Sequence, residues 1–302
     1  MATAMTPGAP ARTLRGSGVD RALPYLMLGP ALFLVLGVIV YPLIDGLRSS
    51  TGFFRFGRQV RSVGLDNYRQ AFADPLFLES LITPARFVVL AVTIETLLGL
   101  GLALLVAREG RYIRRIRATL ILPMIVTPVV VGIVFRLIYA SDVGLLASIA
   151  HAVGLDPPQI LSSGSGAFWG LVFLDVWEWT PLLFLILLAG IQSMPVEPFE
   201  AARVDGAGTW RTFVDHTLPL LRPTILVAVS LRAIDALTTF DQVYVLTRGG
   251  PGTSTQLISL YGYQTFFQFQ QVGYAAAMLF MVAIIVLIGV GFALGLMRRQ
   301  PR

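Results

Sequence analysis

Ionisable side chains interrupt the long apolar runs of this sequence. They are Glu95, Asp175, Glu178, Arg232, Asp235 and, nearer the end of a run, Asp241. A spacing of three residues puts Asp175 and Glu178 on one face of a helix. The same spacing applies to Arg232 and Asp235. Charges inside a membrane are expensive and usually face a partner charge or a water-filled cavity, so these residues are candidates for ion pairing between helices or for contact with a polar substrate.

The depth of these charges follows from helix geometry. At a rise of about 1.5 Å per residue, Asp175 and Glu178 lie ~12–17 Å from the outer end of their run, near the middle of a bilayer. Arg232 and Asp235 reach a similar depth from the other side, so an ion pair between the two runs is expected. Such pairs hold a bundle together, join it to a second subunit, or line a substrate pathway. For Glu95 we expect a structural role.

A polar segment over residues 192–222 separates two apolar runs. Within it, Pro198 suits the first position of a helix, and Gly206 suits the left-handed residue just past the helix end. The helix between them is about two turns, or ~12 Å, long. Ala201 and Ala202 present almost no side chain, so the backbone of another protein could approach this helix closely.

Charged residues on the same short helix, Glu200, Arg203 and Asp205, could orient such a partner. A second short helix is predicted from Thr209, and Leu218-Pro219 is expected to end it. An ordinary loop that packs on the bundle would explain the same residues. From the residues alone the two interpretations are therefore equal.

The elements that carry these residues are six apolar segments, each near the ~20 residues that cross a bilayer. They run over Ala22–Ile44, Phe87–Ala107, Ala118–Phe135, Ala167–Ile191, Pro223–Leu246 and Tyr274–Met297. The sequence therefore predicts an all-α polytopic membrane protein with six transmembrane helices, whose transmembrane domain covers 22–302. Residues 1–21, rich in Ala, Pro, Gly, Thr and Arg, predict a disordered N-terminal tail.

Composition supports a membrane environment. Hydrophobic residues make up 55% of the 302 residues, and charged residues make up only 13%, whereas a soluble domain carries about 25%. The net charge of +6 does not indicate nucleic-acid binding, because Arg gathers in short loops between apolar runs. The densest group is Arg108, Arg111, Arg114, Arg115 and Arg117. It predicts a cytoplasmic side for that loop, which makes both termini cytoplasmic.

Two residue types are missing from the sequence. Without Cys, the chain has no disulfide and no Cys-based metal site. All 23 basic residues are Arg, whereas a phosphate-binding loop of the Walker A type needs a Lys. The chain therefore supplies no standard ATP site, so any ATP hydrolysis belongs to a partner, and we expect no metal or cofactor bound by this chain.

The segment Glu200-Ala201-Ala202, followed by Gly206 and by Leu218-Pro219, closely resembles the EAA loop of bacterial ABC importer permeases. Further motifs resemble carbohydrate-importer permeases of the maltose type and the glycerol-3-phosphate type. These motifs are Gly64-Leu65-Asp66-Asn67-Tyr68, Trp177-Glu178-Trp179-Thr180-Pro181, Leu188-Ala189-Gly190-Ile191-Gln192, Phe240-Asp241, Leu246-Thr247 and Gly249-Gly250-Pro251-Gly252. The resemblance therefore covers most of the chain.

The resemblance implies a type I ABC importer permease fold without enzymatic activity of its own. The loop over 192–222 would be the coupling (EAA) loop. Its ATPase contact would be made by Glu200, Ala201, Ala202, Arg203, Asp205 and Gly206. Expected partners are a second homologous permease, a dimer of ATPase subunits that binds ATP and Mg, and an extracytoplasmic substrate-binding protein. The expected location is the bacterial inner membrane.

The resemblance also implies a sugar, oligosaccharide or polyol as substrate, with glycerol-3-phosphate or a related glycerophosphodiester as the alternative. Residues expected along the pathway are Asp175, Trp177, Glu178, Arg232, Asp235, Phe240, Asp241 and Tyr244. The aromatic residues among them, with Trp179, could stack on sugar rings, although aromatic residues at span ends more often form the interfacial belt. Because Asp235 neighbours Arg232, a neutral sugar is a better match than a phosphate.

Two other classes of membrane protein can be weighed on the same residues. An intramembrane serine protease would use Gly164-Ser165-Gly166 as its nucleophile turn. Because His151 and His216 both lie outside the spans, Ser165 has no His base at membrane depth, which excludes this class. A secondary transporter or a channel that works without an ATPase would also fit the midplane charges. An inverted repeat would favour the secondary transporter, and the sequence shows none convincingly.

Overall fold

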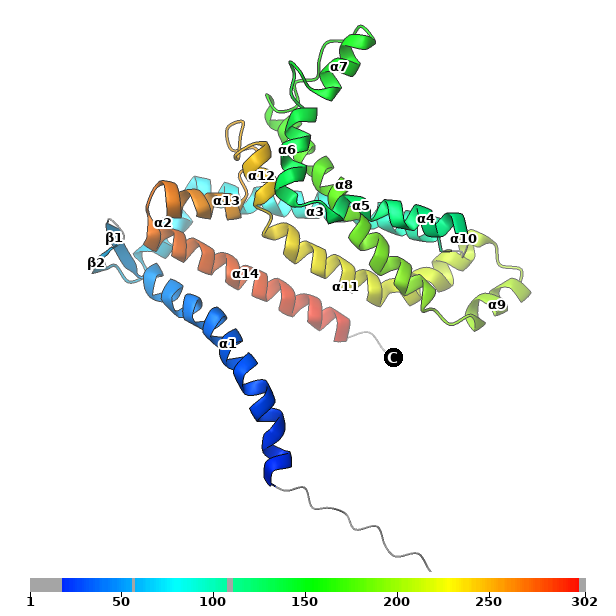
Figure 1. Cartoon of the computed structure of the whole chain (residues 1–302), viewed down its shortest axis with the longest axis horizontal. Coiled ribbons are helices and arrows are strands. Elements are labelled where there is room, and N and C mark those ends of the chain that lie inside the picture. Colours follow the sequence, from blue (N-terminus) through cyan, green and yellow to red (C-terminus); the bar gives the residue numbers. More distant parts are fainter. Residues whose placement is uncertain (1–17, 56–57, 108–110, 299–302) are drawn as a thin grey trace, which may run out of the picture. The chain divides into compact units, whose positions relative to one another are not determined.

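The structure of the protein, a computed structural model, describes residues 18–55, 58–107 and 111–298. Over these residues it is mostly helical, with one short β-hairpin, which confirms the predicted all-α class (Figure 1). The chain divides into two compact units, of which the first ends at Arg48 and the second begins at Ser49.

The first unit consists of helix α1 (Gly18–Ser50), whose last residues run past the unit boundary. The helix begins at Gly18 instead of the predicted Ala22, and the rest of the predicted tail lies outside the described residues. Its segment Tyr25–Ser50 is long and apolar enough to cross a membrane. Lipid is the natural surrounding for a helix of this composition.

The second unit starts with a segment that lies between the first and second predicted spans. Its elements are β1 (Gly52–Arg55), β2 (Arg58–Ser62), α2 (Asp66–Ala73) and α3 (Pro75–Leu105). The two strands form an antiparallel hairpin. Helix α3 begins at Pro75, well before the predicted Phe87. The side chain of Asp74 accepts the Leu76 N–H as an N-cap, and a proline fits the first turn of a helix.

The predicted count of six transmembrane helices is not confirmed. In the described part of the chain, the helical stretches long and apolar enough to cross a membrane are Tyr25–Ser50, Pro75–Leu105, Gly164–Gln192 and Val272–Gly291. They correspond to the first, second, fourth and sixth predicted spans. The differences lie at the third and fifth.

The predicted third span, Ala118–Phe135, is broken into pieces. They are α4 (Arg111–Leu120), α5 (Leu122–Ile125) and α6 (Pro128–Ile138). Thr127 is extended, with ψ at 134°, because a residue that precedes proline is disfavoured in the helical conformation. Helix α6 has 11 residues, too few to cross a bilayer alone.

The predicted fifth span, Pro223–Leu246, is also divided. Helix α11 (Leu218–Leu237) ends before Thr238, and α12 (Asp241–Leu246) follows after a short break. At the other end, α10 (Thr209–Thr212), the π-helical segment η1 (Phe213–Thr217) and α11 follow one another directly. Leu218-Pro219 therefore does not end the second short helix as predicted. The π turn before Pro219 accommodates a residue that lacks the N–H of a regular helix.

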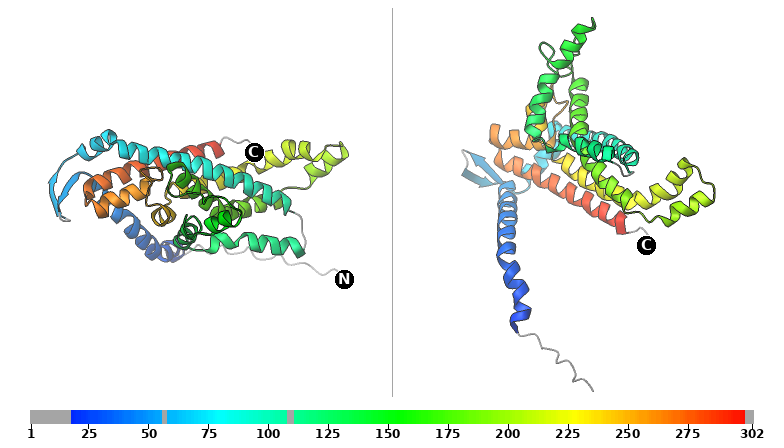
Figure 2. Two further views of the ribbon diagram at one scale, coloured as in Figure 1. Left: turned by 90° about the horizontal axis from the view of Figure 1, so that it is seen from above. Right: turned by 45° about the vertical axis from the view of Figure 1, so that its right-hand side comes forward.

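The remaining elements complete the second unit. They are α7 (Leu145–Ala152), α8 (Gly164–Gln192), α9 (Glu197–Val204), α13 (Ile258–Tyr263), the π-helical segment η2 (Gln264–Gln268) and α14 (Val272–Arg298). Helices α9 and α10 lie at the end of this unit that is away from the β-hairpin (Figures 1 and 2). The predicted coupling segment and the hairpin thus occupy opposite ends of the helical bundle.

Helices α3, α8 and α11 form the frame of the second unit. A Cβ atom added at Gly99 of α3 would lie 2.9 Å from the backbone N of Phe184 in α8, so the backbones approach too closely for any other residue. Leu183 and Leu187 of α8 and Leu221 of α11 are fully buried in the same apolar cluster. This tight packing fixes the positions of the polar residues that the three helices carry.

Asp74 joins the start of α3 to two later helices. Its Oδ2 accepts the hydroxyls of Tyr261 in α13 and Tyr274 in α14, each at 2.6 Å, and its Oδ1 accepts the Leu76 N–H at 2.9 Å. Burial raises the pKa of Asp74, but the hydrogen-bond donors outweigh burial and hold it below its ordinary value. The carboxylate form is therefore the one that this arrangement stabilises.

Replacing Asp74 by Asn should lower the free energy of unfolding by about 1–2 kcal/mol at neutral pH. Because the pKa of Asp74 is lower in the native than in the unfolded chain, its contribution is complete above the unfolded value of about 3.9 and is lost as pH falls through the native value. Denaturation in detergent micelles between about pH 7 and about pH 3 would measure this, and the gap between wild type and variant should close at the acidic end.

The exposed Asp156 provides the control, since Asp156→Asn should change stability by no more than ~0.5 kcal/mol. A gap between wild type and Asp74→Asn that stays constant down to about pH 3 would contradict a role for the carboxylate charge.

Candidate functional site

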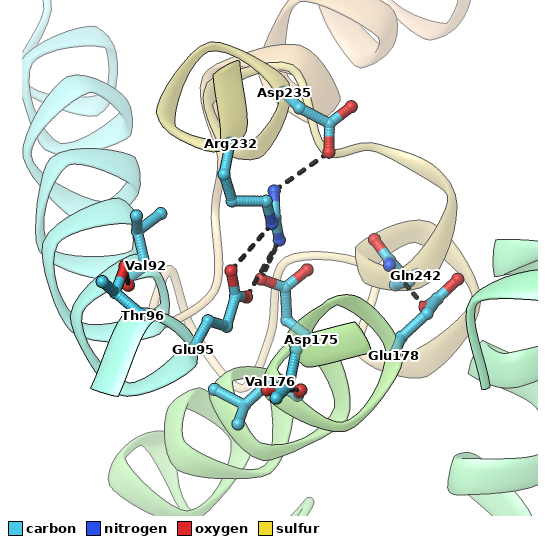
Figure 3. Close-up of polar contacts among 10 residues, drawn as sticks. Val92, Glu95, Thr96, Asp175, Val176, Glu178, Arg232, Asp235 and Gln242 are labelled. Carbon is cyan, nitrogen blue, oxygen red and sulfur yellow. Dashed lines mark hydrogen bonds and ion pairs between the residues drawn. The ribbon is translucent and has the colours of Figure 1, made fainter. Parts of the chain in front are cut away.

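Arg232 of α11 lies at the centre of a buried group of charges (Figure 3). Its Nε lies 2.9 Å from Oε2 of Glu95 in α3, and its Nη2 donates to Oε1 of the same carboxylate at 3.2 Å. Nη2 also donates to Oδ2 of Asp175 in α8, and Nη1 donates to Oδ2 of Asp235 at 2.9 Å. The side chains of Arg232, Glu95 and Asp175 are fully buried. We call these four residues the charge cluster.

The guanidinium of Arg232 is engaged on its face as well as its edges. Its central carbon lies 5.3 Å from the ring centroid of Trp179, within the range of a cation–π contact. Each nitrogen atom lies within 3.2 Å of a carboxylate oxygen, although the contact of Nε with Glu95 Oε2 lacks hydrogen-bond geometry. This residue therefore has little capacity left to bind a further anion.

The charge cluster confirms the expected geometry of an ion pair between the fourth and fifth predicted spans and extends it to α3. Three helices meet at one guanidinium, and removing a partner from such a buried group leaves a charge without compensation. Asp175 is not fully compensated, because its Oδ1 has no hydrogen-bond partner among the described residues.

Glu178 takes a different partner from Asp175, although the two share a helix face. Its buried carboxylate accepts the side-chain amide of Gln242 in α12 at 2.7 Å (Figure 3). Gln242 was not among the predicted site residues. An uncharged amide inside an apolar run gives little indication of a functional site. The break after Thr238, which lets α12 contact α8, was also not predicted.

Aromatic rings form a continuous group where α11 gives way to α12. Phe240 and Tyr244 stack with ring centroids 5.4 Å apart, and Tyr263 lies 5.1 Å from Phe240 and 5.6 Å from Tyr244. Tyr263 was missed from the sequence because it lies on a separate helix. The adjacent Asp241 is exposed.

Trp177 belongs to another part of the surface. Its ring lies 5.4 Å from Phe135 of α6, and it lines an apolar pocket of about 350 Å³ together with residues such as Leu98, Thr180 and Phe184. The predicted pathway residues therefore separate into the charge cluster, Glu178 with its partner Gln242, the aromatic group at Phe240 with the adjacent Asp241, and Trp177.

The predicted coupling helix is present as α9. Pro198 occupies its first turn, and Gly206 follows with φ at +72°, a left-handed conformation that favours glycine. Ala202 is buried, whereas Ala201 is exposed. Its charged members, Glu200, Arg203 and Asp205, are exposed as well.

Large apolar side chains in and near α9 are exposed. Val204 and Trp210 are 87% and 76% exposed. A groove of about 820 Å³ runs beside them, and its lining includes Phe199, Arg203 and Phe213. Exposed apolar residues rimmed by charges are typical of a surface that another protein covers.

The chain is similar to known proteins. Residues 95–300 match the family described as "Binding-protein-dependent transport system inner membrane component". The chain is 34% identical over 263 residues to a sulfoquinovosyl glycerol transport system permease protein of Agrobacterium fabrum, covering 86% of this chain and 85% of that protein. It is 37% identical over 247 residues to the trehalose/maltose transport system permease protein of Thermococcus litoralis, covering 80% and 82%.

The fold is similar to that of a chain in the crystal structure of a bacterial alginate ABC transporter in complex with an alginate pentasaccharide-bound periplasmic protein. The TM-score is 0.82 with 23% sequence identity, and the likeness covers 93% of this chain and 96% of that chain. At this identity the comparison concerns the fold alone.

Replacing Arg232 by Gln should destabilise the protein by about 3–5 kcal/mol, because buried carboxylates lose their cation. The matched control is Arg211→Gln, since Arg211 pairs with Asp215 at 3.4 Å on the surface, where both side chains are at least half exposed. That change should cost no more than ~1 kcal/mol. Thermal unfolding followed by tryptophan fluorescence would compare them, and equal losses would contradict a central role for Arg232.

Proposed function

This chain belongs to the family of binding-protein-dependent transport system inner membrane components, and on that premise we propose how it works as a subunit of a sugar importer. Family membership makes it a multi-pass membrane permease of an ABC transporter and not an enzyme. In our proposal it forms, with a second homologous permease, the pathway for a sugar, oligosaccharide or polyol. An extracytoplasmic binding protein would deliver that substrate. The alginate ABC transporter of similar fold forms a complex with a periplasmic protein that is bound to an alginate pentasaccharide.

The observation that carries the coupling role is the exposed helix α9. Its charged residues and Ala201 face solvent, and apolar Val204 and Trp210 stand beside them at one end of the bundle. A protein that buries this surface gains apolar contact and charge pairing at once. We propose that an ATPase subunit covers this surface. ATP and Mg would bind to that subunit, because this chain has no Lys for a Walker A loop.

The movement that α9 transmits is a rigid-body one. Closure of an ATPase dimer on ATP would displace α9, and the displacement would pass through the turn at 205–208 to α10 and then along η1 into α11, which follow one another directly. Because α11 is tied to α3 and α8 through Arg232, the three helices move together. Such movement switches access to the pathway between the two sides of the membrane. In this scheme α9 and both termini lie in the cytoplasm.

The pathway we propose passes the solvent-exposed part of α11 and α12. Asp235 and Asp241 are exposed there, beside the stacked rings of Phe240 and Tyr244. Aromatic faces can bind the apolar faces of sugar rings, and carboxylates accept hydroxyl hydrogen bonds. The relatives are transport system permeases for neutral trehalose and maltose and for sulfoquinovosyl glycerol.

Purification from its native membrane in mild detergent tests the proposed assembly. The chain should copurify with an ATPase and with a second, non-identical permease, and substrate uptake into liposomes should require ATP. A secondary transporter or channel would instead move substrate alone and without ATP, and that result would overturn the proposal.

Changes in α9 and the turn after it test coupling. Glu200→Lys reverses an exposed charge, and Gly206→Val forces a β-branched residue into a left-handed conformation, at a cost of about 1–3 kcal/mol. Both variants should insert normally and hydrolyse ATP, while transport per ATP falls at least about tenfold, since a displaced helix costs ~1.4 kcal/mol or more of coupling.

Gly208→Val is the matched control for bulk, because Gly208 has an ordinary φ of −70° and open space around it. It should keep more of its transport than Gly206→Val. Full transport by both Glu200→Lys and Gly206→Val would refute the coupling role of α9.

A further inference from the structure

Arg232 is the cation of the charge cluster, and it is closed to solvent. Its side chain has no exposed surface, and its nitrogen atoms face Glu95, Asp175 and Asp235. Among the four residues of the cluster, only Asp235 reaches the surface, where 51% of its side chain is exposed. A substrate that passes this part of α11 therefore meets a carboxylate and not the guanidinium.

The charge cluster has no spare positive charge. Three carboxyl groups surround one guanidinium, so even when both buried carboxyl groups hold a proton, the charge of Asp235 balances that of Arg232. The buried Glu178 is a further acidic group close by on the same helix face. Charges in a poorly solvated setting act over longer distances than charges in water.

We infer that the pathway beside Asp235 rejects anionic sugars and accepts neutral or cationic ones, and that Asp235 sets this preference. The inference rests on the proposed function, in which this face of the chain lines the route of a sugar. A carboxylate, sulfonate or phosphate on the substrate would approach Asp235 with like charge and would find no free guanidinium to bind. Hydroxyl and ammonium groups can instead donate hydrogen bonds to Asp235.

Two arginines contact the far end of α12, where they could attract an anionic sugar. Arg136 donates to the carbonyl of Val245 at 3.0 Å, and the guanidinium carbon of Arg248 lies 6.0 Å from the ring centroid of Tyr244. Both contacts are with the last turns of α12. An anionic sugar attracted there would still have to pass the exposed Asp241 and then Asp235 at the end of α11.

The test uses three probes that share one sugar ring. They are methyl glucoside, which is neutral, methyl glucuronide, which is anionic, and methyl glucosaminide, which is cationic. Each is titrated into the permease with its copurified subunits in lipid nanodiscs, without the binding protein, and contact is followed by saturation-transfer NMR. We expect the glucuronide to bind at least about tenfold more weakly than the glucoside, and the glucosaminide to bind at least as well as the glucoside.

Variants assign the preference to Asp235. Asp235→Asn keeps an oxygen that can accept from Arg232 but removes the charge, and it should reduce the difference between glucoside and glucuronide to about threefold or less. Asp235→Glu keeps the charge and should keep the difference. Asp156→Asn, which removes a charge from an exposed position elsewhere in the chain, should also keep it.

The salt dependence of binding tests the inference on the wild-type protein. Because Asp235 is half exposed, raising the salt from about 0.01 M to about 1 M should shrink the wild-type difference. Equal binding of glucuronide and glucoside by the wild type would overturn the inference, and an unchanged difference in Asp235→Asn would overturn the role of Asp235. Saturation transfer to none of the three probes would instead refute the sugar pathway of the proposed function.

Discussion

The ion pairs of Arg232 are the interaction on which the second unit depends. One guanidinium holds carboxylates from α3, α8 and its own helix α11, and its side chain is fully buried. Apolar packing between helices in lipid provides little orientation, because lipid tails are as apolar as the side chains they replace. A buried Arg with fixed donors supplies that orientation, because only one rotation of each helix brings its carboxylate to the guanidinium.

The same interaction would tie together the two roles that we propose for the chain. The exposed helix α9 lies at one end of the bundle, and the partly exposed Asp235 lies near the far end of α11. Without the charge cluster, a displacement of α9 could slide α11 past its neighbours and leave the rest of the bundle unmoved. With the charge cluster, the helices would respond as one body, and Asp235, its one partly exposed carboxylate, would move with them.

The sequence predicted the parts that depend on local chemistry. Pro198 and Gly206 bounded α9 correctly, and a spacing of three residues put Arg232 beside Asp235. It failed where local preference and apolar composition disagree. The apolar composition predicted one span over Ala118–Phe135, but the extended backbone of Thr127 before Pro128 interrupts the helix there. The partnership of Glu178 with Gln242 depends on a break in the chain that apolar periodicity does not register.

The π-helical segment η1 gives α11 a further property. A π turn contains about one residue more than an α turn, so conversion of η1 into α-helix would rotate everything after it by ~100° about the helix axis. Arg232 would then point away from Glu95 and Asp175, leaving two buried carboxylates without a cation. The charge cluster thus opposes a screw motion of α11. A movement that reaches α11 through η1 would have to leave the rotation of α11 about its own axis unchanged.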